Sequence, residues 1–133
     1  MQVSEFIARA LRLIRVIDPN QPIKPRDMET AMSALNSMMA LWESYPLALG
    51  WIDVSNPSDD VPLEPNAIEP AIYNLAVRLS SEYGQAIDAV IARYAEEGLA
   101  VLRRQYAASN PLALEIDVPC GNARHGFIRW WNY

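Results

Sequence analysis

The sequence predicts an all-α protein, a small four-helix bundle with a long loop between its second and third helices and an extended C-terminal arm. Three observations support this fold class. Apolar residues recur at helical spacing through most of residues 1–108. Ten prolines against five glycines indicate stiff, extended connections. Residues 109–133 carry no helical period, so we expect two units, a helical domain over 1–108 and an extended arm over 109–133.

Length, composition and charge fit one globular domain. The chain has 133 residues, of which 51% are hydrophobic and 20% charged, enough for a single core and unlike a disordered chain. Its net charge of −5 and pI near 4.8 argue against a general nucleic-acid binder. No signal-peptide pattern is present at the N-terminus, and no apolar run approaches the ~20 residues of a membrane span. We therefore expect a soluble protein made in a cytoplasm, with no membrane partner.

Two helices are expected in the first third of the chain. The first is predicted over Ser4–Ile17, with Ser4 as its N-cap. The second is predicted to begin at Pro25 and to end near Ser44, because Tyr45-Pro46 disfavours continuation. We expect this second helix to be the central helix of the core, since large apolar residues recur along it at helical spacing. They are Met28, Met32, Leu35, Met39 and Trp42.

A stripe of basic residues lies on the first predicted helix. Arg9, Arg12 and Arg15 stand at i, i+3 and i+6, on its outer side. The basic charge is concentrated near them, because residues 1–26 hold five basic and two acidic residues whereas 27–133 hold six and fourteen. Such a stripe fits phosphates of DNA or the carboxylates of a partner, and it equally fits a solvated helix face.

A long connection is expected over residues 47–65. It opens with the apolar run LALGWIDV, which is suited to covering one end of the bundle or to forming a short strand-like segment. It continues as a polar, proline-punctuated stretch, and a loop of this length without periodicity is usually functional in a compact domain. Asp59 and Asp60 suggest a cation, but the spaced oxygen ligands and the glycine of a calcium loop are missing.

Two more helices complete the predicted bundle. Asn66 is the predicted N-cap of the third, with Pro70 in the first turn and Gly84 at the C-terminal end. A capping box with Glu69 is part of that prediction. The fourth is predicted over Gln85–Ala108. Gly98 in its middle costs about 1 kcal/mol relative to alanine, so it either permits a close helix crossing or is simply tolerated.

The C-terminal arm ends in a concentration of aromatic residues. Alternating apolar residues after Pro111 have a strand-like period of two. A chain end with so much aromatic area is usually held in place, and Trp, Tyr and Arg are common interface anchors. We expect docking into a neighbouring subunit or partner, with folding back onto its own bundle as the alternative. The candidate binding residues are Phe127, Arg129, Trp130, Trp131 and Tyr133.

No reaction centre is recognisable in the sequence. His125 is the only histidine, and Cys120 is the only cysteine, which excludes an intrachain disulfide and a cysteine-based metal cluster. Phosphate-binding, dinucleotide-binding and nucleophile-elbow motifs are absent. The carboxylate pairs Asp59-Asp60 and Glu96-Glu97 are adjacent in sequence and are expected to point in different directions or into water. We predict no enzyme, no cofactor and no metal.

Two blocks of sequence carry a family resemblance. The stretch ALNSMMALWESYPLALGWI, followed by AIYNLAVRLSSEYGQ, resembles the tail accessory factor of short-tailed, P22-like phages, also called the packaged-DNA stabilization protein or head-to-tail adaptor. The first block contains Leu35, Met38 and Trp42 with the exit Leu49-Gly50, and the second begins just before Asn74. The resemblance covers roughly residues 1–108, and the arm departs from it and is shorter than in that family.

The resemblance implies a non-enzymatic virion protein at the head-tail junction, made in the cytoplasm of the bacterial host. Such adaptors are α-helical and bind beneath the portal ring as a dodecameric ring. They close the DNA-filled head, extend the channel of the packaged DNA without sequence-specific binding, and give the tail nozzle a platform. A C-terminal extension grips the portal and neighbouring copies, which here implies Phe127 to Tyr133.

Three alternatives remain at this stage. One is a head-completion or connector protein of another tailed-phage type, also helical and ring-forming. Another is a small helical DNA-binding protein that uses the basic first helix, which predicts salt-sensitive duplex binding. The third is a cell-wall hydrolase that acts during genome entry, which predicts that one acidic residue is essential for clearing peptidoglycan.

Overall fold

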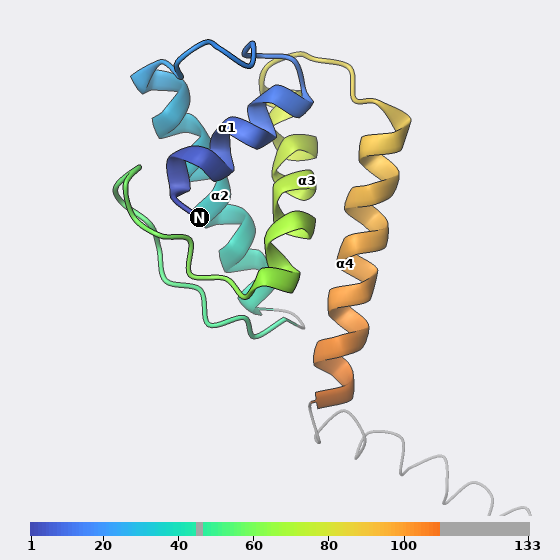
Figure 1. Ribbon diagram of the computed structural model, residues 1–133. Coiled ribbons are helices and arrows are strands. Elements are labelled where there is room, and N and C mark those ends of the chain that lie inside the picture. The colour runs from blue at the N-terminus through green and yellow to red at the C-terminus, as the bar shows by residue number, and fades with distance from the viewer. Residues whose placement is uncertain (45–46, 110–133) are drawn as a thin grey trace, which may run out of the picture.

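Four helices form the part of the chain that the computed structural model describes, residues 1–44 and 47–109 (Figure 1). They are α1 (Val3–Leu13), α2 (Pro25–Ser44), α3 (Pro65–Glu82) and α4 (Ala89–Ser109). Within these residues the only β-type pairing is an isolated bridge between Gln2 and Asp60. The prediction of a small all-α bundle is confirmed, and the predicted bounds of α2 agree with the structure.

Helix α3, rather than α2, lies at the centre of the bundle. It packs against α1 and α2 on one side and against α4 on the other (Figure 1). Ala67, Ala71 and Ala76 of α3 are fully buried, and these small side chains let the surrounding helices approach closely. The prediction that α2 is the central helix is therefore wrong, although its Leu35 and Trp42 do lie in the core as expected.

The start of α1 is capped by the long loop and not by Ser4. The helix begins at Val3, and the N-cap Gln2 makes no side-chain cap hydrogen bond. Instead, the backbone N–H groups of Val3 and Ser4 donate to the carbonyl oxygens of Asp59 and Pro57, both at 2.9 Å. The first N–H groups of a helix lack partners within it, so this tertiary contact satisfies two of them and ties the loop to α1.

Helix α1 ends at Leu13, four residues before the predicted end. Arg15 has a φ of 59°, in the left-handed region. Its N–H donates to the carbonyl of Arg12, and the N–H of Val16 donates to that of Leu11, both at 3.0 Å. This pair of bonds is the Schellman motif, which usually has glycine in the left-handed position. The apolar period persists beyond the helix because Ile17 is buried after the turn.

Helix α3 begins one residue before the predicted cap. Pro65 is its first residue, and the Asn66 side chain donates to Gln105 of α4 at 3.1 Å instead of capping. Pro70 consequently lies inside the helix, beyond the first turn, where it cannot donate to the Asn66 carbonyl. The end of α3 agrees with the prediction, because Gly84 follows the C-cap with a φ of 64°.

Helix α4 begins at Ala89 and not at Gln85. A side-chain oxygen of Asp88 accepts a 2.9 Å hydrogen bond from the N–H of Val90, which is the bond of an N-cap. Gly98 marks a close helix crossing, because a Cβ built there would lie 3.0 Å from the Cβ of Pro70. Of the two explanations offered for this glycine, the structure supports the close crossing. None of the helices in residues 1–44 and 47–109 is long and apolar enough to cross a membrane.

Candidate interaction surfaces

Two side chains of α2, Asn36 and Glu43, hold the long loop. Asn36 donates from Nδ2 to the Val54 carbonyl at 3.0 Å, and its Oδ1 accepts from the Val54 N–H at 3.1 Å and from Trp51 Nε1 at 3.3 Å. Two helical turns later along α2, Glu43 Oε1 accepts the N–H groups of Leu49 and Trp51 at 2.7 and 3.1 Å. The loop is therefore an ordered surface with fixed backbone positions.

This ordered loop presents an apolar side chain to solvent. Ile52 is 72% exposed, between the anchored residues Trp51 and Val54. Leu41 on α2 is 56% exposed. Single exposed apolar residues are common on monomers, but a rigid segment that displays one is suited to contact with another subunit. The structure thus makes the loop a candidate protein-binding surface.

A second surface is the groove between α3 and α4. Its volume is about 500 Å³, and α3 and α4 supply its walls. The rings of Tyr73 and Tyr94 meet edge to face, with centroids 5.6 Å apart, and Tyr94 remains 46% exposed. The close crossing at Gly98 sets the depth of the groove. Its lining residues are Glu69, Pro70, Tyr73, Tyr94, Glu97, Gly98 and Val101.

Asn74 fixes the spacing of the two helices beside this groove. Its Nδ2 donates to the carbonyl of Pro70 at 2.8 Å within α3 and to the carbonyl of Ala95 in α4 at 2.9 Å. A single side chain therefore bridges the two walls. On the rim, Glu97 pairs with Arg93 at 3.1 Å, but both side chains are mostly exposed, so this ion pair adds little to stability.

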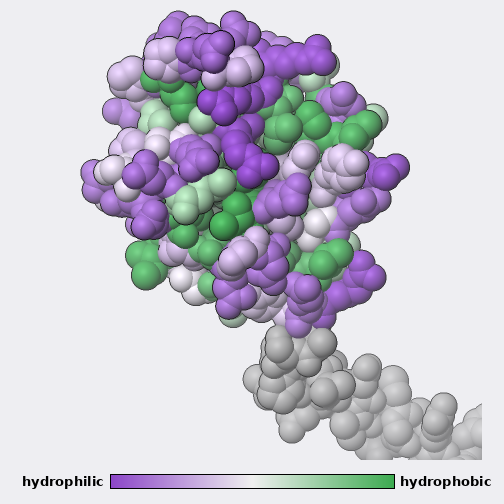
Figure 2. Space-filling model, in the orientation of Figure 1, coloured by the Kyte–Doolittle hydropathy of each residue, from purple (hydrophilic) through white to green (hydrophobic). Residues whose placement is uncertain are grey.

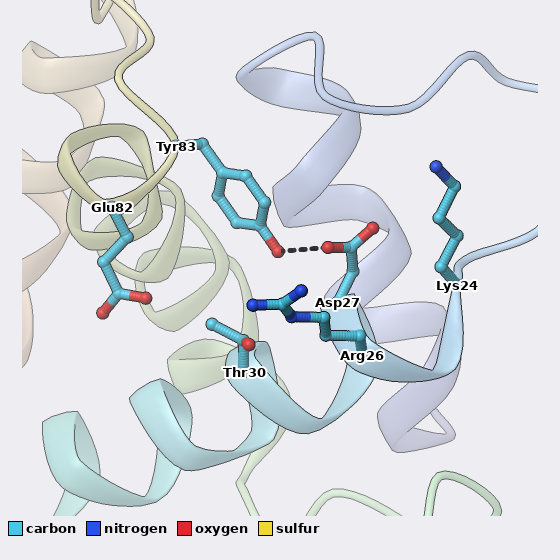
Figure 3. A pocket seen from close by; sticks show the side chains of 6 residues that line it. All are labelled: Lys24, Arg26, Asp27, Thr30, Glu82 and Tyr83. Carbon is cyan, nitrogen blue, oxygen red and sulfur yellow. Dashed lines mark hydrogen bonds between the residues drawn. The ribbon is translucent and has the colours of Figure 1, made fainter.

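Another hollow, of about 490 Å³, lies between the start of α2 and the end of α3 (Figure 3). The Tyr83 hydroxyl donates to Asp27 Oδ1 at 3.0 Å, with Arg26 beside the pair. Burial, followed by the hydrogen bond to Asp27, raises the pKa of Tyr83 to about 12. The hydroxyl therefore stays protonated at neutral pH. Because Lys24 and Glu82 also line the hollow, its charges are mixed and favour neither an anion nor a cation.

The predicted basic stripe is exposed but is not wholly helical. Arg9 and Arg12 are exposed on α1, whereas Arg15 lies after the helix, in the left-handed turn. None of the three forms an ion pair within the described residues, where Arg93–Glu97 is the ion pair found. The stripe is thus available to an anionic partner.

The adjacent carboxylate pairs of the sequence were not expected to form a site. Asp59 Oδ2 accepts the N–H of Asn56, and Asp59 also supplies a carbonyl to α1. In residues 1–44 and 47–109, no group of three or more His, Cys, Asp or Glu side chains is placed to hold a metal ion. On the face drawn in Figure 2, apolar side chains form separate patches among polar ones.

The predicted arm residues Phe127, Arg129, Trp130, Trp131 and Tyr133 lie outside the described residues. Two surface features were missed from the sequence. The α3–α4 groove depends on helix spacing, for which the sequence offers only Gly98 as a signal. The Asn36 anchor has no local signal, because its partners lie 15 and 18 residues away.

The described residues form a small helical bundle that carries an ordered loop, a groove between α3 and α4 and exposed arginines on α1. The family model of the P22 tail accessory factor matches residues 3–129. This match covers the helical domain and extends into the arm, so the expectation that the resemblance stops near residue 108 is wrong. No curated protein matches the chain.

The chain belongs to the P22 tail accessory factor family. It is therefore a phage tail-associated, virion protein with a structural role, and its partners are components of the virion head or tail.

Proposed function

We propose that this protein is a head-to-tail adaptor, a connector subunit that binds beneath the portal ring. Neighbouring copies form a ring, which closes the DNA-filled head and provides the platform for the tail nozzle. The observation that carries this proposal is the family match, which spans the helical domain and most of the arm. In this proposal the protein acts by assembly and not by catalysis.

The surfaces of the helical domain fit a subunit held on several sides. The loop presents Ile52 from a backbone that Asn36 and Glu43 hold in place, which suits a repeated contact with a neighbour or the nozzle. Closed rings need two different patches on each subunit, because the contact runs head to tail around the ring. The exposed cations Arg9 and Arg12 offer a second, chemically distinct patch.

We assign the aromatic end of the arm to the portal and to neighbouring copies. Trp130 and Trp131 supply large apolar area, and Arg129 supplies a charge that pairs with carboxylates. A segment that docks on a partner adds contacts without a larger core. The arginine stripe faces either carboxylates of the portal or phosphates of the packaged DNA, and such phosphate contacts carry no sequence information.

The double substitution Trp130→Ala with Trp131→Ala tests the role of the arm. We expect far-UV circular dichroism and the melting temperature of the free subunit to stay nearly unchanged, while binding to purified portal rings is lost. Cys120→Ser is the matched control in the same arm and should bind as the unmodified protein does. An unfolded double mutant would show that these tryptophans belong to the core, and unchanged portal binding would remove the arm from the contact.

A further inference from the structure

The groove between α3 and α4 has no occupant in the proposal above. Its floor is apolar, with Tyr73, Tyr94 and Val101, and Glu69 lies at its edge. The second acidic residue, Glu97, already pairs with Arg93, whose guanidinium also lies 5.9 Å from the centroid of the Tyr94 ring. Tyr94 and Val101 are 46% and 43% exposed, large values for apolar side chains at a helix crossing. Glu69 has no ion-pair partner among the residues that the structure describes. The groove therefore favours a ligand that is aromatic and positively charged.

One segment of the same chain has this chemistry. Asp117 is the last acidic residue of the sequence, and Arg124 and Arg129 follow it. Phe127, Trp130, Trp131 and Tyr133 also fall in this stretch. Aromatic rings pack edge to face or offset on tyrosine, and a guanidinium binds both carboxylates and aromatic faces. Charge and ring content are thus complementary between the segment and the groove.

We propose that the α3–α4 groove binds residues 123–133 of its own chain in the free subunit. This contact goes beyond the adaptor role and does not depend on it. Before a virion partner is present, the groove covers the aromatic end of the arm and so limits aggregation through exposed aromatic surface.

The chain is long enough for this contact. Val101 lies eight residues before Ser109, so the groove is roughly 12 Å back along α4 from the end of the helix. Residues 110–122 span up to about 45 Å when extended. A tether of this length gives the arm an effective concentration in the millimolar range near its own groove. A weak contact therefore forms within one molecule in preference to between two molecules. A stronger site on a partner can then displace it.

Disulfide trapping in the full-length protein tests the contact. In a Cys120→Ser background, Ile128→Cys on the arm is combined with Val101→Cys in the groove. The matched control combines Ile128→Cys with Ala100→Cys, an exposed residue on the same helix that does not line the groove. The two positions are adjacent in α4, about 1.5 Å apart along its axis, so they differ mainly in the face of the helix.

We expect the Val101 variant to form an intrachain disulfide at least about tenfold faster than the Ala100 variant. Adding Glu69→Arg to the Val101 variant should slow trapping, and Arg129→Glu should restore it by reversing the charges of the pair. Equal rates at the two positions would overturn the proposal, as would disulfides formed between chains at a rate that rises with protein concentration. Circular dichroism of each variant before oxidation confirms that differences in rate come from folded protein.

Discussion

Replacing Asn36 by alanine tests how the long loop is held. The substitution removes three hydrogen bonds, two to the Val54 backbone at 3.0 and 3.1 Å and one to the Trp51 indole at 3.3 Å. A typical hydrogen bond contributes about 1 kcal/mol to stability, and a buried group left without its partner costs about 1–3 kcal/mol. The groups around Asn36 are partly buried, and the third bond is long. We therefore expect the free energy of unfolding to fall by about 2 kcal/mol.

Urea denaturation measures this loss, with tryptophan fluorescence and far-UV circular dichroism as two probes. Ser37→Ala is the matched control, because Ser37 is the next residue of α2 and is exposed. It should change the free energy of unfolding by less than about 0.5 kcal/mol. Hydrogen exchange should also accelerate at the amides of Val3 and Ser4, since the loop caps them. If Asn36→Ala matches Ser37→Ala in both measurements, Asn36 does not anchor the loop.

Three further substitutions test local features of the helices. Arg15→Gly should raise the free energy of unfolding by about 1 kcal/mol, because its left-handed φ suits glycine, whereas Arg12→Gly in the helix should lower it by a similar amount. Gly98→Ala should destabilise despite a better helix propensity, because its Cβ meets the rigid Pro70 ring, and an unchanged or higher melting temperature would contradict the close crossing. The pKa of Tyr83 is higher in the folded protein than in the unfolded chain, so its contribution to stability is complete below about pH 10 and is lost as the pH rises toward 12. Between about pH 9 and 11.5, the free energy of unfolding should therefore fall more steeply than in Tyr83→Phe.

Apolar periodicity predicted the helices well, because it reports burial directly. The start of α2 at Pro25 agrees with the structure, and of its predicted stripe Leu35, Met39 and Trp42 are buried while Met28 and Met32 are partly buried against the core. The apolar periodicity predicted too late an end for α1, because Ile17 remains buried after the chain has left the helix. The turn at Arg15 could not be recognised from the sequence, because arginine occupies a position where glycine would have indicated the end of the helix.

Helix starts were harder to predict than helix bodies. Ser4 and Asn66 have the side chains of N-caps, but tertiary contacts use these positions differently. A carbonyl from a loop more than 50 residues away caps α1, and local sequence rules do not include such partners. The start of α4 was predicted at Gln85, although Asp88 offered a local signal that was missed, because an aspartate directly before an apolar run is a recognisable cap.

The interaction surfaces depend on the spacing between helices, which sequence patterns describe least. The groove exists because Gly98 meets Pro70 closely and because Asn74 bridges α3 and α4. Taken singly, each of these three residues can be explained within its own helix, so none of them predicts the groove. The binding role of the aromatic end stays a prediction from composition, since Trp130, Trp131 and Arg129 lie outside the described residues.

The adaptor role rests on one central claim, that this subunit assembles on a portal ring. Native mass spectrometry of the protein alone, and then mixed with the portal protein of the same phage, tests this claim most directly. The account predicts a monomer in isolation and, on mixing, a complex in which the portal ring gains about one subunit for each portal subunit. A protein that stays monomeric in the presence of intact portal rings would contradict the adaptor role.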